Sequence, residues 1–319
     1  MESCQKQETR RLDSLLHWEW ALLLLLLVAA FFPVLREMYA LWMAPGSYSS
    51  HAPLVPLISA WFVWRQRAQL QAMPRHPAKS GLLLIAFSLL VLIGSGVLRV
   101  YTSAGIALLL CLTGMVAYWG GWRWLGKLWF PLAFLIFMLP IPEILIARLN
   151  LSLKLMVMHA TVFALQCVRV PVAMDGATLH LAGGDMIVGD VCAGLRSLTA
   201  LITLAALFAY MQRRRPWPVP AAVLAIAVPA ALGGNIVRIF LDGLLVNAYG
   251  PDLLFSPLLT TELTGAIDLH TISGVVLFGL VLLALNAAVW LTEACVRWVR
   301  RAKHRNPPLH TLAKEPKVC

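Results

Sequence analysis

Cys192, Arg238 and His270 stand near one end of the last three apolar segments of the chain, and together they could catalyse acyl transfer. A cysteine thiolate is a strong nucleophile, but it needs one group to move protons and another to stabilise the oxyanion of a tetrahedral intermediate. Histidine titrates near neutral pH and suits the first task, whereas arginine stays charged and offers forked donors for the second. The three residue types therefore predict covalent catalysis by a thiol, provided that the fold brings them together.

The segments that must position these residues are membrane helices. The chain is 60% hydrophobic and only 13% charged, which is about half the charged fraction of an ordinary soluble domain. Its apolar stretches reach about 20 residues, the length that a helix needs to cross a hydrocarbon core of about 30 Å. We expect an all-α polytopic membrane protein with about eight transmembrane helices, near residues 17–35, 49–64, 80–98, 102–120, 128–147, 192–211, 217–240 and 270–293.

Basic residues set the expected orientation. Most of the 26 lysine and arginine residues fall in alternate connections if both termini face the cytoplasm, which is the arrangement that the positive-inside rule favours. The predicted organisation is a cytoplasmic tail over residues 1–16, one transmembrane domain over 17–296 and a basic cytoplasmic tail over 297–319. Because the net charge of +11 arises from these short clusters, it predicts contact with membrane lipid rather than with nucleic acid.

Two segments do not read as simple spans. Residues 150–169 carry Lys154 and His159 and would break the alternation of charge, so we expect an interfacial or re-entrant helix there. Pro131, Pro140 and Pro142 remove backbone donors and are expected to bend or terminate the helix over residues 128–147.

A short β structure is expected outside the membrane. Asp175-Gly176 and Gly183-Gly184 are turn signals, and the residues from Thr178 to Leu181 between them read as a strand. We predict a small extracytoplasmic β-hairpin over about residues 170–190, leading into the helix that carries Cys192.

Topology places the three candidate residues at one level. The run Arg213-Arg214-Arg215 fixes one connection in the cytoplasm, so the opposite ends of the two flanking helices, which carry Cys192 and Arg238, face outward. The last helix ends at a basic cluster, which places its beginning, and His270 with it, on the outer face. Ionisable residues in membrane helices are costly and are candidates for function by default. The alternatives to catalytic roles are that Cys192 is a buried thiol without a reaction, that Arg238 extends to lipid headgroups and that His270 is a structural histidine.

Three further residues are candidates for supporting roles. Asp190 is expected to cap the helix and so to place Cys192 in its first turn, where the helix dipole favours the thiolate. Arg196 follows Cys192 by four residues and is expected on the same helical face, either adding positive potential or forming a structural ion pair. Asn235 precedes Arg238 by three residues and either assists it or packs.

The order and spacing of these motifs resemble those of the exosortase/archaeosortase family. The resemblance rests on Asp-Val-Cys-Ala-Gly-Leu-Arg-Ser (190–197), Asn-Ile-Val-Arg (235–238) and His-Thr-Ile-Ser-Gly (270–274). Further similar stretches are Tyr-Ser-Ser-His (48–51), with Leu-Val-Pro (54–56), and the proline-rich stretch 130–142. The resemblance covers roughly residues 45–290, and a histidine at position 270 favours the bacterial exosortase branch.

The resemblance implies an eight-helix protease-transpeptidase of the bacterial inner membrane with its active site on the periplasmic face. Cys192 would be the nucleophile, Arg238 would stabilise the oxyanion or substrate, and His270 would act as general base and acid. The substrates would be exported proteins that carry a C-terminal sorting signal, made of a Pro-Glu-Pro-type motif, a transmembrane helix and a basic tail. Such enzymes often accompany exopolysaccharide production, and the acceptor nucleophile stays open.

The chain departs from many relatives at Ala193, where they have serine. Because only residues 297–319 follow the last predicted helix, we do not expect the soluble C-terminal domain that is fused to some relatives. The six cysteines of the chain show neither a disulfide framework nor zinc-ligand spacing, so no metal or cofactor is expected. Whether Cys167 pairs with Cys192 is left open.

Two other functions compete with the thiol enzyme. A transporter or flippase for an exopolysaccharide precursor would need ionisable residues near the bilayer midplane, where transport sites lie. A membrane acyltransferase that uses His270 without the thiol would retain its activity after Cys192→Ala.

Overall fold

The computed structural model describes residues 25–44, 46–98, 100–189, 194–261 and 265–305. These residues are mostly helical and form two compact units, residues 1–142 and 143–319. Within these described ranges, six helices are long and apolar enough to cross a membrane, and two shorter apolar helices accompany them, Leu54–Arg65 (α2) and Leu195–Met211 (α8). A multi-pass membrane fold is therefore supported, whereas the predicted count of eight spans is not confirmed. The six are Leu25–Met43, Ser80–Leu98 (α4), Tyr101–Gly120 (α5), Glu143–Cys167 (α7), Pro218–Tyr249 (α9) and Ile272–Trp298, which lies within α11 (Leu269–Arg305).

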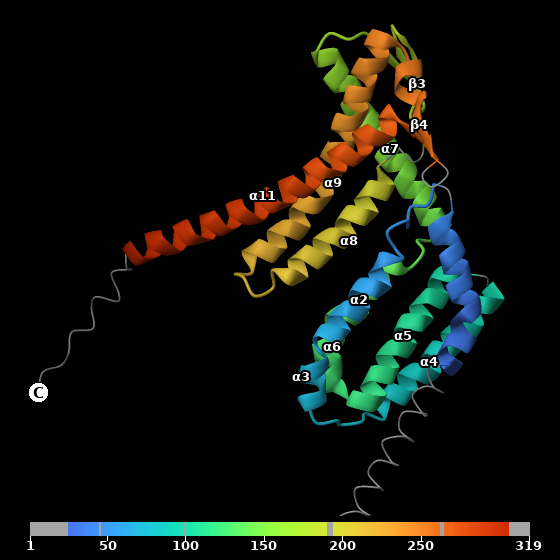
Figure 1. The fold of residues 1–319 in the computed structure, drawn as a ribbon, viewed down its shortest axis with the longest axis vertical. Coiled ribbons are helices and arrows are strands. Elements are labelled where there is room, and N and C mark those ends of the chain that lie inside the picture. The colour runs from blue at the N-terminus through green and yellow to red at the C-terminus, as the bar shows by residue number, and fades with distance from the viewer. Residues whose placement is uncertain (1–24, 45, 99, 190–193, 262–264, 306–319) are drawn as a thin grey trace, which may run out of the picture. The chain divides into compact units, whose positions relative to one another are not determined.

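The first unit is a set of packed helices that includes α3 (Arg67–Ala72), α6 (Trp122–Phe134) and the 3₁₀ turn η1 (Leu135–Met138). Helices α4 and α5 pack against each other (Figure 1) at a point where both carry glycine. A Cβ added at Gly81 would lie 2.4 Å from the backbone nitrogen of Tyr118, so the two backbones approach closely. Small residues permit such contacts where apolar helices meet in lipid.

The helix predicted over residues 128–147 is interrupted. Helix α6 passes into the turn η1, which ends at Met138. Helix α7 begins only at Glu143, beyond Pro140 and Pro142. Both prolines lack a backbone donor, and each disfavours helical geometry in the residue before it, so the helix cannot continue through them. The expected termination by proline therefore occurs. It falls inside the predicted range 128–147, so residues 143–147 belong to the next helix, α7.

Helix α7 covers most of residues 150–169, where an interfacial or re-entrant helix was expected. It runs without a break over 25 residues, and its length and composition suffice for a membrane span. Its buried residues Val157, Met158 and Leu165 pack in one core cluster with residues of the following sheet and of α9. Helix α7 is therefore packed against the sheet and α9 within the second unit.

The predicted hairpin is a three-stranded antiparallel sheet. Strands β1 (Val172–Asp175) and β3 (Gly184–Ile187) pair on either side of β2 (Thr178–Leu181), the strand that the turn signals predicted. Leu179 and Met186 face the core, whereas His180 Nδ1 lies 2.7 Å from Asp185 Oδ1 on the exposed face. The alternation of apolar and polar residues thus gives the sheet one buried face and one wet face.

The end of the second unit that carries this sheet also contains α10 (Asp252–Phe255) and an antiparallel pair that the sequence reading did not anticipate. This pair consists of β4 (Pro257–Thr261) and β5 (Gly265–Asp268) and leads directly into α11. Helix α9 packs against α7, α8 and α11, as Figure 1 shows for the last two. Helix α9 is therefore the element around which the second unit is built.

Candidate functional site

A pocket of about 70 Å³ lies between α8, α9 and α11. Its lining combines apolar side chains from all three helices with polar side chains from α8 and α9. The lining residues are Ser197 and Leu201 of α8, Ala231, Gly234, Asn235 and Arg238 of α9, and Gly274, Leu277, Phe278 and Val281 of α11. Two of the sequence-predicted residues, Arg238 and Asn235, are thus brought to one pocket.

Arg238 lies well inside α9 and not at its end. The span was predicted to finish near residue 240, but α9 continues to Tyr249 because Ile239 and Val246 are buried in the core cluster formed with α7 and the sheet. At 1.5 Å per residue, Arg238 stands about 30 Å along the helix from Pro218. This distance equals the thickness of a hydrocarbon core, so a membrane boundary at Pro218 places Arg238 at the opposite boundary.

The guanidinium of Arg238 is held by α9 and α11. Arg238 Nε lies 4.0 Å from Asp242 Oδ2, and Ser273 Oγ donates a hydrogen bond of 3.4 Å to Asp242 Oδ1. A Cβ added at Gly274 would lie 3.0 Å from Arg238 Cζ, so the guanidinium rests against the backbone of α11. The Arg238 side chain is only 18% exposed, and the charge faces the pocket instead of extending freely to lipid headgroups.

The beginning of α8 differs from the prediction. The helix starts at Leu195 with Gly194 as its N-cap, and Gly194 has φ +88°, a left-handed conformation that ends the helix at this point. Asp190 and Cys192 lie outside the described residues. The structure therefore does not test the predicted cap at Asp190 or the placement of Cys192 in a first helical turn, and both stay predictions.

Asn235 connects this helix start to α9. A Cβ built at Gly194 would lie 2.9 Å from Asn235 Nδ2, so the amide packs against the residue two positions after Cys192. Asn235 is buried. Asn235 stands one turn before Arg238 on α9. The same face of α9 therefore contacts Gly194, two residues after Cys192, and carries the guanidinium.

Arg196 occupies the first turn of α8. Its Nε is buried and has no hydrogen-bond partner within the part of the chain that the structure describes. His270 is the second residue of α11 and stands one turn before Gly274, which rests on Arg238. The His270 side chain lies outside the described residues.

Sequence reasoning missed Asp242, the ion-pair partner of Arg238, and Ser273, which donates a hydrogen bond to Asp242. Asp242 follows Arg238 by four residues, a spacing that on a helix predicts contact, so the signal was present. Ser273 and Gly274 belong to the motif that contains His270, but only the packing of α11 on α9 assigns them a role. Among the described residues, no group of three or more histidine, cysteine, aspartate or glutamate residues is arranged to hold a metal ion.

The arrangement places the Arg238 guanidinium in a small, largely apolar pocket between α8, α9 and α11. Because a low local dielectric strengthens electrostatic interactions, a guanidinium held there can stabilise a developing oxyanion effectively. Cys192 and His270 are close to the pocket along the chain, since one precedes Gly194 by two residues and the other precedes Gly274 by four. The pocket therefore suits acyl transfer if both side chains turn toward it.

The model of the transmembrane exosortase family matches residues 42–287 of the chain. This match covers most of the chain, and the chain belongs to that family. Searches of curated proteins and of solved structures found no match to it.

Proposed function

From membership of the transmembrane exosortase family, we propose that the protein is a membrane-embedded cysteine protease-transpeptidase. Its substrates are exported proteins with a C-terminal sorting signal, composed of a Pro-Glu-Pro-type motif, a transmembrane helix and a basic tail. The reaction takes place at the outer face of the bacterial inner membrane, with both termini of the enzyme in the cytoplasm. The observation that carries the proposal is the guanidinium of Arg238, held at the pocket by Asp242 and Gly274.

In the proposed reaction, the Cys192 thiolate attacks the scissile carbonyl carbon while His270 holds the proton taken from the thiol. Arg238 donates hydrogen bonds to the resulting oxyanion. When the C–N bond breaks, His270 gives its proton to the leaving amine, and the helix and basic tail of the signal depart. A thioester remains, which an amine, a hydroxyl or water attacks after giving a proton to His270, and the thiolate is released.

The position of Arg238 supports this proposal over the transporter or flippase. A substrate site for transport is expected near the bilayer midplane. Arg238 lies about 30 Å along α9 from Pro218, which corresponds to the far edge of a hydrocarbon core. A site at this edge is reached by a peptide bond just outside the membrane.

The test is processing of a co-expressed protein that carries such a sorting signal. Cys192→Ala should abolish processing, whereas Cys167→Ala, which changes an exposed cysteine at the end of α7, should leave it intact. Mass spectrometry of the wild-type enzyme should detect an acyl adduct on Cys192 that hydroxylamine removes. Full processing by Cys192→Ala would refute the assignment of the nucleophile and would favour the acyltransferase that uses His270 alone.

A further inference from the structure

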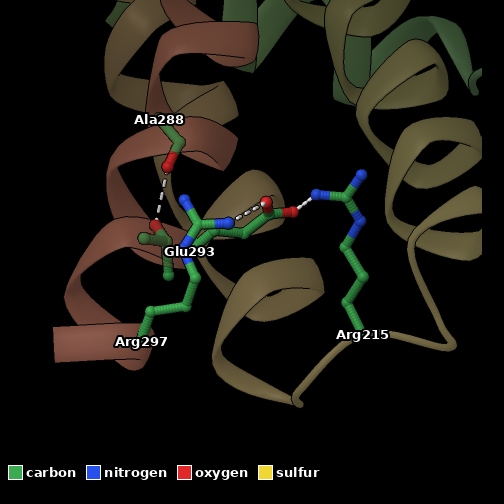
Figure 2. Close-up of polar contacts among 5 residues, drawn as sticks. Arg215, Ala288, Glu293 and Arg297 are labelled. Atoms are coloured by element: carbon green, nitrogen blue, oxygen red, sulfur yellow. Dashed lines mark hydrogen bonds and ion pairs between the residues drawn. The ribbon is translucent and has the colours of Figure 1, made fainter. Parts of the chain in front are cut away.

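An ionic cluster lies at the opposite end of the second unit from Arg238. Figure 2 shows the Glu293 carboxylate of α11 between two guanidinium groups, those of Arg215 and Arg297. Arg215 belongs to the connection between α8 and α9, and Arg297 Nη1 lies 3.6 Å from Glu293 Oε2 one turn along α11. The cluster therefore joins the end of α11 to the α8–α9 connection.

The same residues line a pocket of about 270 Å³, together with Pro216 and Val296. This volume is just below the usual range for sites that enclose a drug-sized ligand, and it suits a headgroup better than a whole metabolite. The Arg215 and Arg297 side chains are 43% and 57% exposed, so both retain donors that face the surroundings. The lining thus combines three charged side chains with the apolar Pro216 and Val296.

The charge of the pocket is not balanced. One carboxylate serves two guanidinium groups, which leaves one net positive charge at the pocket itself. Arg214 precedes Arg215 in the chain, and the exposed Arg301 follows Arg297 by one helical turn, so the surroundings add further positive charge. A ligand with one negative charge would complete the neutralisation.

The depth of the pocket indicates what kind of anion reaches it. The apolar span within α11 ends at Trp298, directly after Arg297, and α9 begins at Pro218, three residues after Arg215. Two tryptophans at this level, Trp217 and Trp298, are 79% and 70% exposed. Exposed tryptophans beside arginines at the ends of apolar helices are typical of the membrane–water interface, where lipid phosphates lie.

We propose that this pocket binds the phosphodiester headgroup of an anionic phospholipid, with Arg215 and Arg297 as its donors. Basic pockets between helix ends at the interface are suited to such headgroups. Glu293 holds the two arginines in place and opposes the anion by its own charge. The lipid thereby holds α11 against the α8–α9 connection, about 30 Å along α9 from the site at Arg238.

The test uses the full chain in a neutral detergent and measures binding of short-chain phosphatidylglycerol by microscale thermophoresis. The double variant Arg215→Gln/Arg297→Gln should weaken the affinity about thirtyfold, since each cation near a lipid surface contributes roughly fivefold. Glu293→Gln should strengthen it severalfold, because the repelling carboxylate is gone while both arginines remain. If the double variant does not fold, Glu293→Gln decides the question alone.

A matched double variant, Arg65→Gln/Arg67→Gln, removes two arginines that lie over tryptophan rings in the first unit. It should change the affinity less than twofold, and short-chain phosphatidylcholine should not compete. An equal loss in this control would show diffuse surface charge and overturn the proposal, as would weaker or unchanged binding by Glu293→Gln. Equally tight binding of inorganic phosphate would assign the pocket to a free anion and overturn the lipid.

Discussion

The contact between Gly274 and Arg238 gives the sharpest prediction. A Cβ at position 274 would lie 3.0 Å from Arg238 Cζ and 3.1 and 3.2 Å from its two Nη atoms. These separations are tighter than ordinary Cβ contacts, so Gly274→Ala must move the guanidinium by a few tenths of an ångström. Because the displaced atoms are the far end of a flexible side chain, we expect the fold to tolerate this shift.

The effect on activity should be large by comparison. A misplacement of about 1 Å can cost about 100-fold in rate, so a shift of a few tenths of an ångström should lower kcat for signal processing about 3- to 10-fold in Gly274→Ala. Stability should hold or rise, since alanine is better than glycine in a helix by about 1 kcal/mol. The assay is single-turnover cleavage of a reconstituted sorting-signal peptide, run beside thermal unfolding in the same detergent.

Gly279→Ala is the matched control, because a Cβ at this position of α11 would meet nothing within 4 Å. It should raise stability by the same helix propensity and leave kcat unchanged. Wild-type cleavage by Gly274→Ala would refute the view that the position of Arg238 matters for the reaction. A loss of stability in Gly274→Ala alone would indicate that its defect is structural.

Three more predictions follow from the described contacts. Arg238→Lys keeps a cation opposite Asp242 but loses the forked donors, so thermal unfolding should stay near wild type while single-turnover cleavage falls about 100-fold. Asp242→Asn removes the buried counter-charge and should lower the free energy of unfolding in denaturant titrations by about 2 kcal/mol, less than a fully buried pair costs because the groups are 4.0 Å apart. Burial lowers the pKa of His51, in the turn between Leu25–Met43 and α2, below its ordinary value of 6.5, so the unfolded chain binds the proton first as the pH falls. Wild-type stability should therefore decline as the pH drops through and below about 6.5, and His51→Gln should flatten that decline in thermal unfolding scans.

Hydropathy and basic clusters located most of the helices, because both report directly on the bilayer. They failed where tertiary packing decides the boundary. Helix α9 extends past Arg238 and Asp242, whose charges mark the end of an apolar stretch, because Ile239 and Val246 are buried against α7 and the sheet. A hydropathy reading of α9 alone cannot include this contact.

The small sheet shows the opposite case, in which the sequence held more information than the prediction used. The two turn signals, at Gly176 and Gly184, both have positive φ in the structure. Two turns around one strand imply three strands, and β1–β2–β3 is that arrangement. The pair β4–β5 has no comparable signal that was recognised, and it was missed.

For the candidate site, the sequence pointed to Arg238 and Asn235 through their residue types and level, and the structure brings both to one pocket. Sequence could also have identified Asp242 from its i+4 spacing. It could not identify Gly274 as a support for the guanidinium, because that role depends on the rotation of α11 against α9. The start of α8 was missed because Gly194 adopts a left-handed conformation, and Asp190 was the stronger capping residue by type.

The cost of placing an arginine in α9 gives a reason to expect function at this position. A guanidinium at the end of a membrane helix is normally stabilised by extending to headgroups and water. Here the side chain is 18% exposed, Ser273 of α11 donates a hydrogen bond to Asp242, and Gly274 of α11 presents its backbone to the guanidinium. A larger side chain at position 274 would displace the guanidinium, because even a Cβ there would lie 3.0 Å from Arg238 Cζ. In the proposed reaction, glycine at this position leaves the held cation and the adjoining pocket open to an oxyanion.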